Sequence, residues 1–223
     1  QQAITLGQQV VNLDQGYLAI YPIMAEAYQR LGDKDRALKY YFDYVLKSEK
    51  LNNKSHLIQA YIKLGWYYQL DGQYEKASQL YDKAINLSRQ EGDKQSEALA
   101  LRKLAVWYID KNNYDQALDL LTKSAAINLE YPGNFENLKN LACDYFDIGL
   151  VFVNKNDHTA AKDFYGRSLK IFQNLKLSNE LSDCYFNLGE IYLFQKQYQK
   201  AQDYYFKGLR LDQQHHNIVN LPG

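Results

Sequence analysis

The sequence predicts an all-α protein, an α-solenoid of antiparallel helix pairs. Three observations predict this class. One pattern of aromatic and small residues recurs five times, its copies follow at nearly constant steps, and only 3 prolines occur in 223 residues. Repetition at such a period is typical of helical arrays in which each unit packs on its neighbours. We therefore expect helices along most of the chain.

Each copy begins with an aromatic residue or leucine, followed three and four positions later by an apolar and a small residue. An aromatic residue comes seven positions after the first. Residues at this spacing lie on one face of a helix. A turn, an alanine and another large apolar residue four positions on complete the copy. The copies span residues 21–41, 61–81, 101–121, 145–165 and 185–205.

The register is fixed by the aromatic residue before each turn. These residues are Tyr28, Tyr68, Tyr108, Phe152 and Tyr192, so the steps are 40, 40, 44 and 40 residues. Most of the 21 tyrosines fall in a few equivalent slots of the pattern. We interpret them as helix–helix core with the hydroxyl at the edge, rather than as a stacking surface for bases or a ligand cage.

Small residues and turn residues complete the expected helix pairs. The small residue in each first helix and the alanine in each second helix should let the two helices approach closely. The turns within the first, second, third and fourth copies carry Gly32, Gly72, Asn112 and Asn156, which tolerate the positive φ that ends a helix. Lys196 departs from this rule, so we expect a more strained turn in the fifth copy.

This pattern resembles the tetratricopeptide repeat, whose W-x2-L-G-x2-Y…A-x3-F motif is matched closely by residues 61–81 and 185–205. The usual unit has about 34 residues. The longer period here is similar to the subgroup found in kinesin light chains, spindle-orientation adaptors and bacterial peptide-pheromone receptors. The resemblance covers residues 17–212 and implies a right-handed superhelix whose inner, concave face is lined by the first helix of each unit.

The register also gives the expected boundaries. A break at residues 14–16 ends a first helix over residues 1–13. This helix looks like the second helix of an earlier unit, which suggests excision from a longer array or a lone capping helix. Residues 130–134 should form a linker that carries the four extra residues between copies three and four. We expect a partial repeat in 1–16, repeats in 17–52, 53–93, 94–133, 134–177 and 178–212, and a fraying tail in 213–223.

Composition argues against several classes of function. Lys plus Arg equals Asp plus Glu at 26 each, so no net charge draws the chain to nucleic acid or to an anionic membrane. No apolar run approaches the roughly 20 residues of a membrane-spanning helix. Cys143 and Cys184 lack zinc-site spacing and predict free thiols in a reducing compartment, which we take to be the cytoplasm.

No catalytic motif is present, since the sequence lacks a phosphate-binding glycine loop, a GxSxG elbow and an HExxH helix. His56 lies near a helix start, His158 stands in a turn slot usually held by tyrosine, and His215 and His216 lie in the tail. We expect none of the four to bind metal or act in catalysis. The sequence therefore predicts no enzyme, no cofactor and no metal site.

The resemblance places groove-facing slots one, five and eight residues after the first aromatic residue of each copy. This inner face is apolar through the middle three units, and Trp66 is the residue we expect to anchor a partner. In order, the slots hold Pro22, Glu26 and Gln29; Ile62, Trp66 and Gln69; Arg102, Val106 and Ile109; Phe146, Leu150 and Val153; and Phe186, Glu190 and Leu193.

Two interpretations of the apolar face remain open: long helices could bury it against their neighbours, or it could bind an amphipathic helix or an extended apolar peptide. The leading function is a non-enzymatic scaffold for a protein or peptide partner. The alternative is a ligand- or peptide-sensing module of a larger bacterial signalling protein, with Asn154 and Asn187 as the candidate contacts to a peptide backbone. Self-association through the terminal repeats also stays open. The chaperone-tail clamp needs Lys and Asn in slots that hold Pro22 and Glu26, or Ile62 and Trp66, which argues against it.

Overall fold

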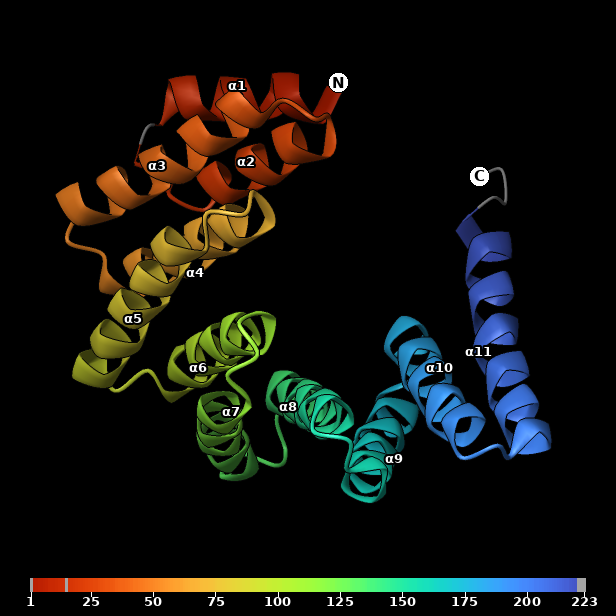
Figure 1. Cartoon of the computed structure of the whole chain (residues 1–223). Coiled ribbons are helices and arrows are strands. Elements are labelled where there is room, and N and C mark those ends of the chain that lie inside the picture. The colour runs from red at the N-terminus through yellow and green to blue at the C-terminus, as the bar shows by residue number, and fades with distance from the viewer. Residues whose placement is uncertain (1, 15, 220–223) are drawn as a thin grey trace. The chain divides into compact units, whose positions relative to one another are not determined.

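The computed structural model describes residues 2–14 and 16–219, and it describes only the backbone of residues 2, 3 and 215–219. Within these residues the structure has eleven α-helices and no strand (Figure 1). The helices are α1 (Gln2–Leu13), α2 (Ile20–Arg30), α3 (Lys34–Lys50), α4 (Lys54–Leu70), α5 (Tyr74–Glu91), α6 (Lys94–Asp110), α7 (Tyr114–Leu129), α8 (Phe135–Asn154), α9 (His158–Leu175), α10 (Ser178–Phe194) and α11 (Tyr198–Val219).

The chain divides into two compact units, Gln1–Trp107 and Tyr108–Gly223, which we describe separately. In the first unit each helix from α1 to α4 packs on the next one in the chain, and in the second unit the same holds from α7 to α10. The first helices of the five pairs are α2, α4, α6, α8 and α10, and the second helices are α3, α5, α7, α9 and α11. The predicted class, an all-α solenoid of helix pairs, is confirmed.

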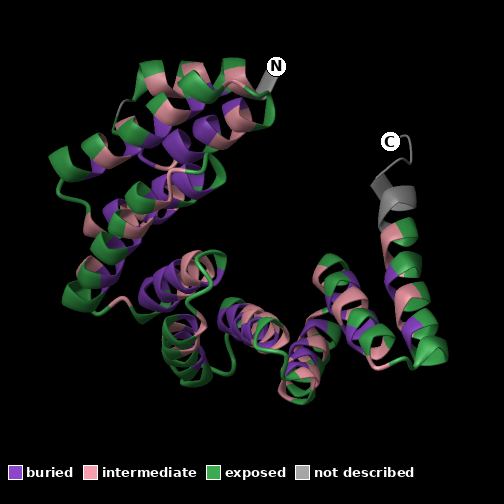
Figure 2. Cartoon of the chain, in the orientation of Figure 1, coloured by how far each residue is buried: buried purple, intermediate pink, exposed green. Residues whose placement is uncertain are grey.

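Close helix contact depends on glycine facing tyrosine. A Cβ added to Gly65, Gly149 or Gly189 would lie 2.7, 2.8 and 2.7 Å from the ring of Tyr81, Tyr165 and Tyr205, respectively. Because such distances are shorter than real Cβ contacts, a side chain at these glycines would displace the ring. The alanines of the second helices are likewise buried, and buried residues form stripes along the packed faces in Figure 2.

The turns follow the predicted backbone rule. Gly32 and Gly72 have φ of 76° and 77°, and Asn112 and Asn156 have φ of 59° and 60°. Lys196 also adopts the left-handed conformation, with φ of 59°. A lysine there carries a steric cost of about 1 kcal/mol that glycine avoids, which agrees with the expected strain.

Some boundaries differ from the expected ones. The four extra residues are shared between the linker at 130–134 and α8, which has 20 residues where α4, α6 and α10 have 17. Helix α11 continues to Val219, so residues 213–219 are helical rather than frayed. The expectations for residues 1, 15 and 220–223, and for the side chains of His215 and His216, lie outside the described residues.

Candidate functional site

In the first unit, helices α2, α3 and α4 enclose an open hollow of about 420 Å³, which we call the Trp66 hollow. Its walls come from two consecutive first helices, and its floor comes from the second helix between them. It is lined by Glu26, Gln29, Arg30, Tyr41, Lys63 and Trp66.

The floor of the hollow is fixed by Tyr41, which is 2 % exposed. Its hydroxyl donates a hydrogen bond of 3.1 Å to Oε1 of Gln29, and its ring lies 5.4 Å from the ring of Tyr67. Burial raises the pKa of Tyr41 to about 12. The floor therefore stays uncharged and holds Gln29 in one orientation.

The walls carry charges that remain accessible. Nζ of Lys63 lies 2.6 Å from Oε1 of Glu26, and both side chains are partly exposed. Such exposed pairs contribute little to stability, typically less than about 1 kcal/mol, so a ligand can compete for either partner. Arg30, in the last turn of α2, is exposed beside them.

Trp66 offers the aromatic surface of this hollow, with 36 % of the residue exposed. Nζ of Lys103, from α6, lies 3.9 Å from the ring centroid, which is a cation–π contact. The tryptophan is thus oriented by one cation and has Lys63 on its own helix. The site combines an apolar ring with three cationic side chains and one carboxylate.

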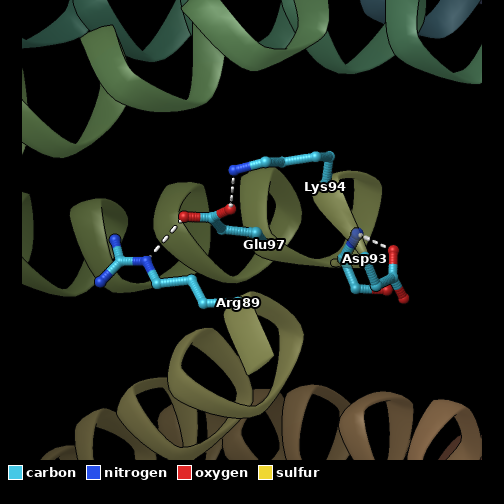
Figure 3. A network of polar contacts seen from close by, with 5 residues as sticks. Arg89, Asp93, Lys94 and Glu97 are labelled. Carbon is cyan, nitrogen blue, oxygen red and sulfur yellow. Dashed lines mark hydrogen bonds and ion pairs between the residues drawn. The ribbon is translucent and has the colours of Figure 1, made fainter. Parts of the chain in front are cut away.

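A buried carboxylate lies at the α5–α6 junction, near the start of the helix that brings Lys103 to Trp66 (Figure 3). The side chain of Glu97 is 6 % exposed and accepts hydrogen bonds of 2.7 Å from Nε of Arg89 and 3.0 Å from Nζ of Lys94. Burial alone would raise the pKa of Glu97, but these hydrogen bonds outweigh it and hold the pKa below its ordinary value. Asp93 caps α6 by accepting from the backbone N–H of Ser96.

Several predicted groove residues of the first three repeats are buried. Ile62 and Ile109 are 4 % and 8 % exposed, and Gln69 is 7 % exposed and accepts a 2.9 Å hydrogen bond from Tyr81. Their side chains are therefore not on a surface that a partner could contact. Pro22 is buried as well, and Arg102 and Val106 are half-buried. Of the anchors expected in the first unit, the structure leaves Trp66 open.

In the second unit, most of the predicted groove residues contact other residues of the same unit. The half-buried Phe146 packs on Tyr165 with ring centroids 5.2 Å apart, and Leu150 is half-buried. Asn154 is exposed and donates to the carbonyl oxygen of Leu150. The exposed Glu190 accepts a 2.7 Å hydrogen bond from the hydroxyl of Tyr205.

A second hollow, of about 470 Å³, lies against α10 and α11, and we call it the α11 hollow. It includes the predicted groove residues Phe186 and Leu193. Its other lining residues come from α11 and are mainly apolar: Tyr198, Ala201, Gln202, Tyr205, Phe206 and Leu209.

Lys63 and Lys103 were missed by the sequence analysis. Both stand two residues after the first aromatic or leucine of their copy, whereas the slots taken from the resemblance lie one, five and eight residues after it. Their recurrence 40 residues apart was a signal in the sequence. The structure shows that this slot reaches the same surface as Trp66.

Other candidate chemistry is sparse among the described residues. There, no three His, Cys, Asp or Glu side chains gather where they could hold a metal ion. The ring of His158 packs 4.2 Å from that of Phe194. Cys143 is half-buried and Cys184 buried, both as free thiols. In this part of the chain, no helix has the length and apolar character needed to cross a membrane.

Stacked antiparallel helix pairs, with a glycine–tyrosine contact in three of the five repeats, define a helical repeat protein. The sequence model of the tetratricopeptide repeat matches residues 17–90, 56–130 and 137–214. The chain therefore belongs to the tetratricopeptide repeat family, as its motif predicted. No curated protein sequence matches it.

Solved structures share this fold at low sequence identity. BtubC (BKLC) from P. vanneervenii superposes with a TM-score of 0.78 at 19 % identity, over 100 % of this chain and 90 % of that one. The TPR-like repeats of a putative kinesin light chain from Podosopora anserina give 0.69 at 16 %, over 91 % and 97 %. A Rap protein complexed with Competence and Sporulation Factor gives 0.76 at 15 %, over 87 % and 53 %.

Proposed function

We propose that this protein is a non-enzymatic scaffold that binds an acidic peptide segment of a protein partner in the Trp66 hollow. The observation that carries the proposal is the exposed ring of Trp66, set among Arg30, Lys63 and Lys103. Tryptophan and arginine are enriched among the residues that dominate binding energy at interfaces. The free thiols Cys143 and Cys184 support the cytoplasm as its compartment.

The arrangement assigns a role to each wall. An apolar side chain of the peptide packs on Trp66, and a neighbouring carboxylate displaces Glu26 from Lys63. Among the residues that line the hollow, Arg30 and Lys63 outnumber the single carboxylate of Glu26, which gives it a local positive excess although the whole chain is neutral. Such an excess speeds the encounter with acidic segments and weakens as salt is added.

The test begins with a random peptide library displayed on phage and selected against the immobilised full chain. We expect enrichment of peptides in which Asp or Glu flanks a large apolar residue. Binding of one selected peptide is then measured by fluorescence anisotropy. Trp66→Ala should weaken it by roughly 30-fold or more, the usual range for an interface hot spot.

Two further variants accompany this measurement, one to test the lysine charges and one as a control. Lys63→Gln combined with Lys103→Gln should reduce both the affinity and its salt dependence. Leu46→Ala truncates a leucine that is 59 % exposed on α3 and should leave binding unchanged. Selection of peptides without acidic residues, or equal binding by Trp66→Ala, would contradict the proposal.

A second candidate is a peptide-sensing module of a larger bacterial signalling protein. The similarity to a Rap protein complexed with Competence and Sporulation Factor favours it. The asparagines expected to hold a peptide backbone add little. Asn187 already accepts from Tyr165 and donates to the carbonyl oxygen of Asp183, whereas Asn154 is exposed. The gene sequence decides: an effector or DNA-binding domain in the same reading frame supports this candidate, and a reading frame without one opposes it.

A further inference from the structure

Helices α9 and α11 are equivalent second helices, 40 residues apart in the repeat. Ala161, Tyr165 and Leu169 of α9 correspond to Ala201, Tyr205 and Leu209 of α11. What covers α9 therefore indicates what the corresponding face of α11 fits.

Helix α10 covers this face of α9 with one stripe of side chains. Leu188 and Ile191 form a buried cluster with Ala161 and Tyr165. Oδ1 of Asn187 accepts a 3.2 Å hydrogen bond from the hydroxyl of Tyr165. At the end of the stripe, the ring of Phe194 lies 4.2 Å from that of His158. The covering helix thus presents Asn, Leu, Ile and Phe at positions i, i+1, i+4 and i+7.

Among the described residues, the helix packed extensively on α11 is α10 (Figure 1), and the face of α11 equivalent to the covered face of α9 is open. Leu209 is 44 % exposed, Phe206 53 % and Tyr198 64 %. They border the α11 hollow, whose lining is nearly all apolar. Phe206 stands where α9 has Gly166, so this face is more apolar than its covered counterpart.

We propose that the α11 hollow is a docking surface for an amphipathic helix of a partner, which packs on α11 as α10 packs on α9. The partner helix carries an Asn-Leu-x2-Ile-x2-Phe stripe or a close equivalent, with its apolar residues over Ala201 and Leu209. Shape and apolar area select it rather than charge, because no charged side chain is in the lining and its polar side-chain groups are Gln202 and the hydroxyls of Tyr198 and Tyr205. This surface is separate from the Trp66 hollow, and the proposal does not depend on it.

The probe is a fluorescein-labelled peptide with the sequence of α10, Ser178–Phe194, in which Cys184 is replaced by alanine. Ala60 and Ala100 occupy the same slot as Cys184 in other repeats, so the change preserves the packing face. Titration with the full chain, followed by anisotropy, should show saturable binding. A peptide with Leu188→Lys and Ile191→Lys should not bind.

Matched variants of the full chain locate the site. Leu209→Lys should weaken peptide binding at least tenfold. Leu46→Lys changes another exposed leucine, 59 % exposed on α3 against 44 % for Leu209, and should leave binding unchanged. Both substitutions are at exposed positions, and circular dichroism checks that the helices persist.

Two results would overturn the proposal. One is absence of saturable binding, or binding that Leu209→Lys leaves intact, which would mean that the peptide sits elsewhere. The other is a concentration-dependent dimer of the chain alone, seen by light scattering and lost in Leu209→Lys. That dimer would make a second copy of this chain, rather than a partner helix, the occupant of the surface.

Discussion

The Trp66 hollow in repeat one and the α11 hollow in repeat five share two slots of the repeat, yet their chemistry differs. Gln29 and Tyr41 in the first correspond to Leu193 and Tyr205 in the second. In repeat one, α4 adds Lys63 and Trp66 to the hollow, whereas in repeat five none of the described helices follows α11.

The comparison separates framework residues from recognition residues. The tyrosine slot is kept, but its hydroxyl bonds to Gln29 in repeat one and to Glu190 in repeat five. In the same way, the slot of Glu97 at the α5–α6 junction holds Leu181 in the last repeat, and both side chains are buried. One backbone pattern can therefore support a polar hollow in one unit and an apolar hollow in the other.

The largest expected effect tests whether a larger side chain is tolerated better at an alanine that lines a hollow than at one covered by another helix. Ala77 and Ala201 share one slot and are 0 % and 2 % exposed, but Ala201 lines the α11 hollow, into which a larger side chain can extend. Ala77→Trp should destabilise the protein by about 3 kcal/mol or more through overpacking. Ala201→Trp should cost about 1 kcal/mol or less, because the indole can enter the hollow.

Urea denaturation followed by circular dichroism measures both variants, with hydrogen exchange to assign the loss to a unit, since repeat arrays can unfold in more than one step. Ala161→Trp should behave like Ala77→Trp, because α10 covers Ala161. Equal losses for Ala77→Trp and Ala201→Trp would show that the α11 hollow is not open.

The next effect compares the stability given by the charged Glu97 with that given by a leucine in the same slot, as at Leu181. Arg89→Ala leaves the buried Glu97 carboxylate with fewer donors and should destabilise the first unit by about 2 kcal/mol. Glu97→Leu introduces the residue that Leu181 places in this slot, and should be neutral or stabilising. Thermal unfolding of the two variants checks this order, and a Glu97→Leu protein less stable than Arg89→Ala would contradict it.

The same carboxylate gives a pH dependence with a defined sign. Because Arg89 and Lys94 hold the pKa of Glu97 below its ordinary value, their stabilisation is complete above about pH 4.3, the ordinary glutamate value. It is lost as the pH falls through the lowered pKa. Glu97→Leu should remove this part of the acid sensitivity, measurable as a smaller change in denaturation midpoint between neutral and acid pH.

The smallest effect compares the two tyrosine hydroxyls. Tyr41→Phe should cost about 1–2 kcal/mol, because it leaves Gln29 without its buried donor, whereas Tyr205→Phe should cost less than about 1 kcal/mol because Glu190 is exposed and can be hydrated. Urea midpoints at pH 7 measure the difference, and a larger loss in Tyr205→Phe would reverse the comparison.

An alkaline titration extends the tyrosine test. Burial and the hydrogen bond to Glu190 raise the pKa of Tyr205 to about 12. The unfolded chain loses this proton near pH 10. The stability linked to the hydroxyl is therefore present below about pH 10 and lost as the pH rises to about 12, and Tyr205→Phe should lose less stability over that interval.

The sequence predicted the framework because each slot obeys a local rule. Gly65 faces Tyr81, and Gly32 has positive φ, for reasons of size and backbone freedom that a single residue reveals. Trp66 was expected on the inner face from the slots that the resemblance gives, and it is 36 % exposed. Lys63 was missed because the register taken from the resemblance did not include its slot.

Other features depend on neighbours that the local pattern does not contain. Ile62 and Gln69 are buried because α4 packs on both α3 and α5. Glu97 is buried together with its charge because Arg89 reaches it from the preceding helix. The open face of α11 has the same alanine and tyrosine slots as α9, so only the arrangement of helices distinguishes a covered face from an open one.

The thiol of Cys184 can report how often the contact between α9 and α10 opens. It is 0 % exposed, lies 3.6 Å from Oγ of Ser168, and burial raises its pKa to about 12. A shielded, protonated thiol does not react with alkylating reagents, so modification requires that α10 first lift from α9. The alkylation rate of Cys184 at neutral pH therefore measures how often this helix opens, and no cysteine has to be introduced for the measurement.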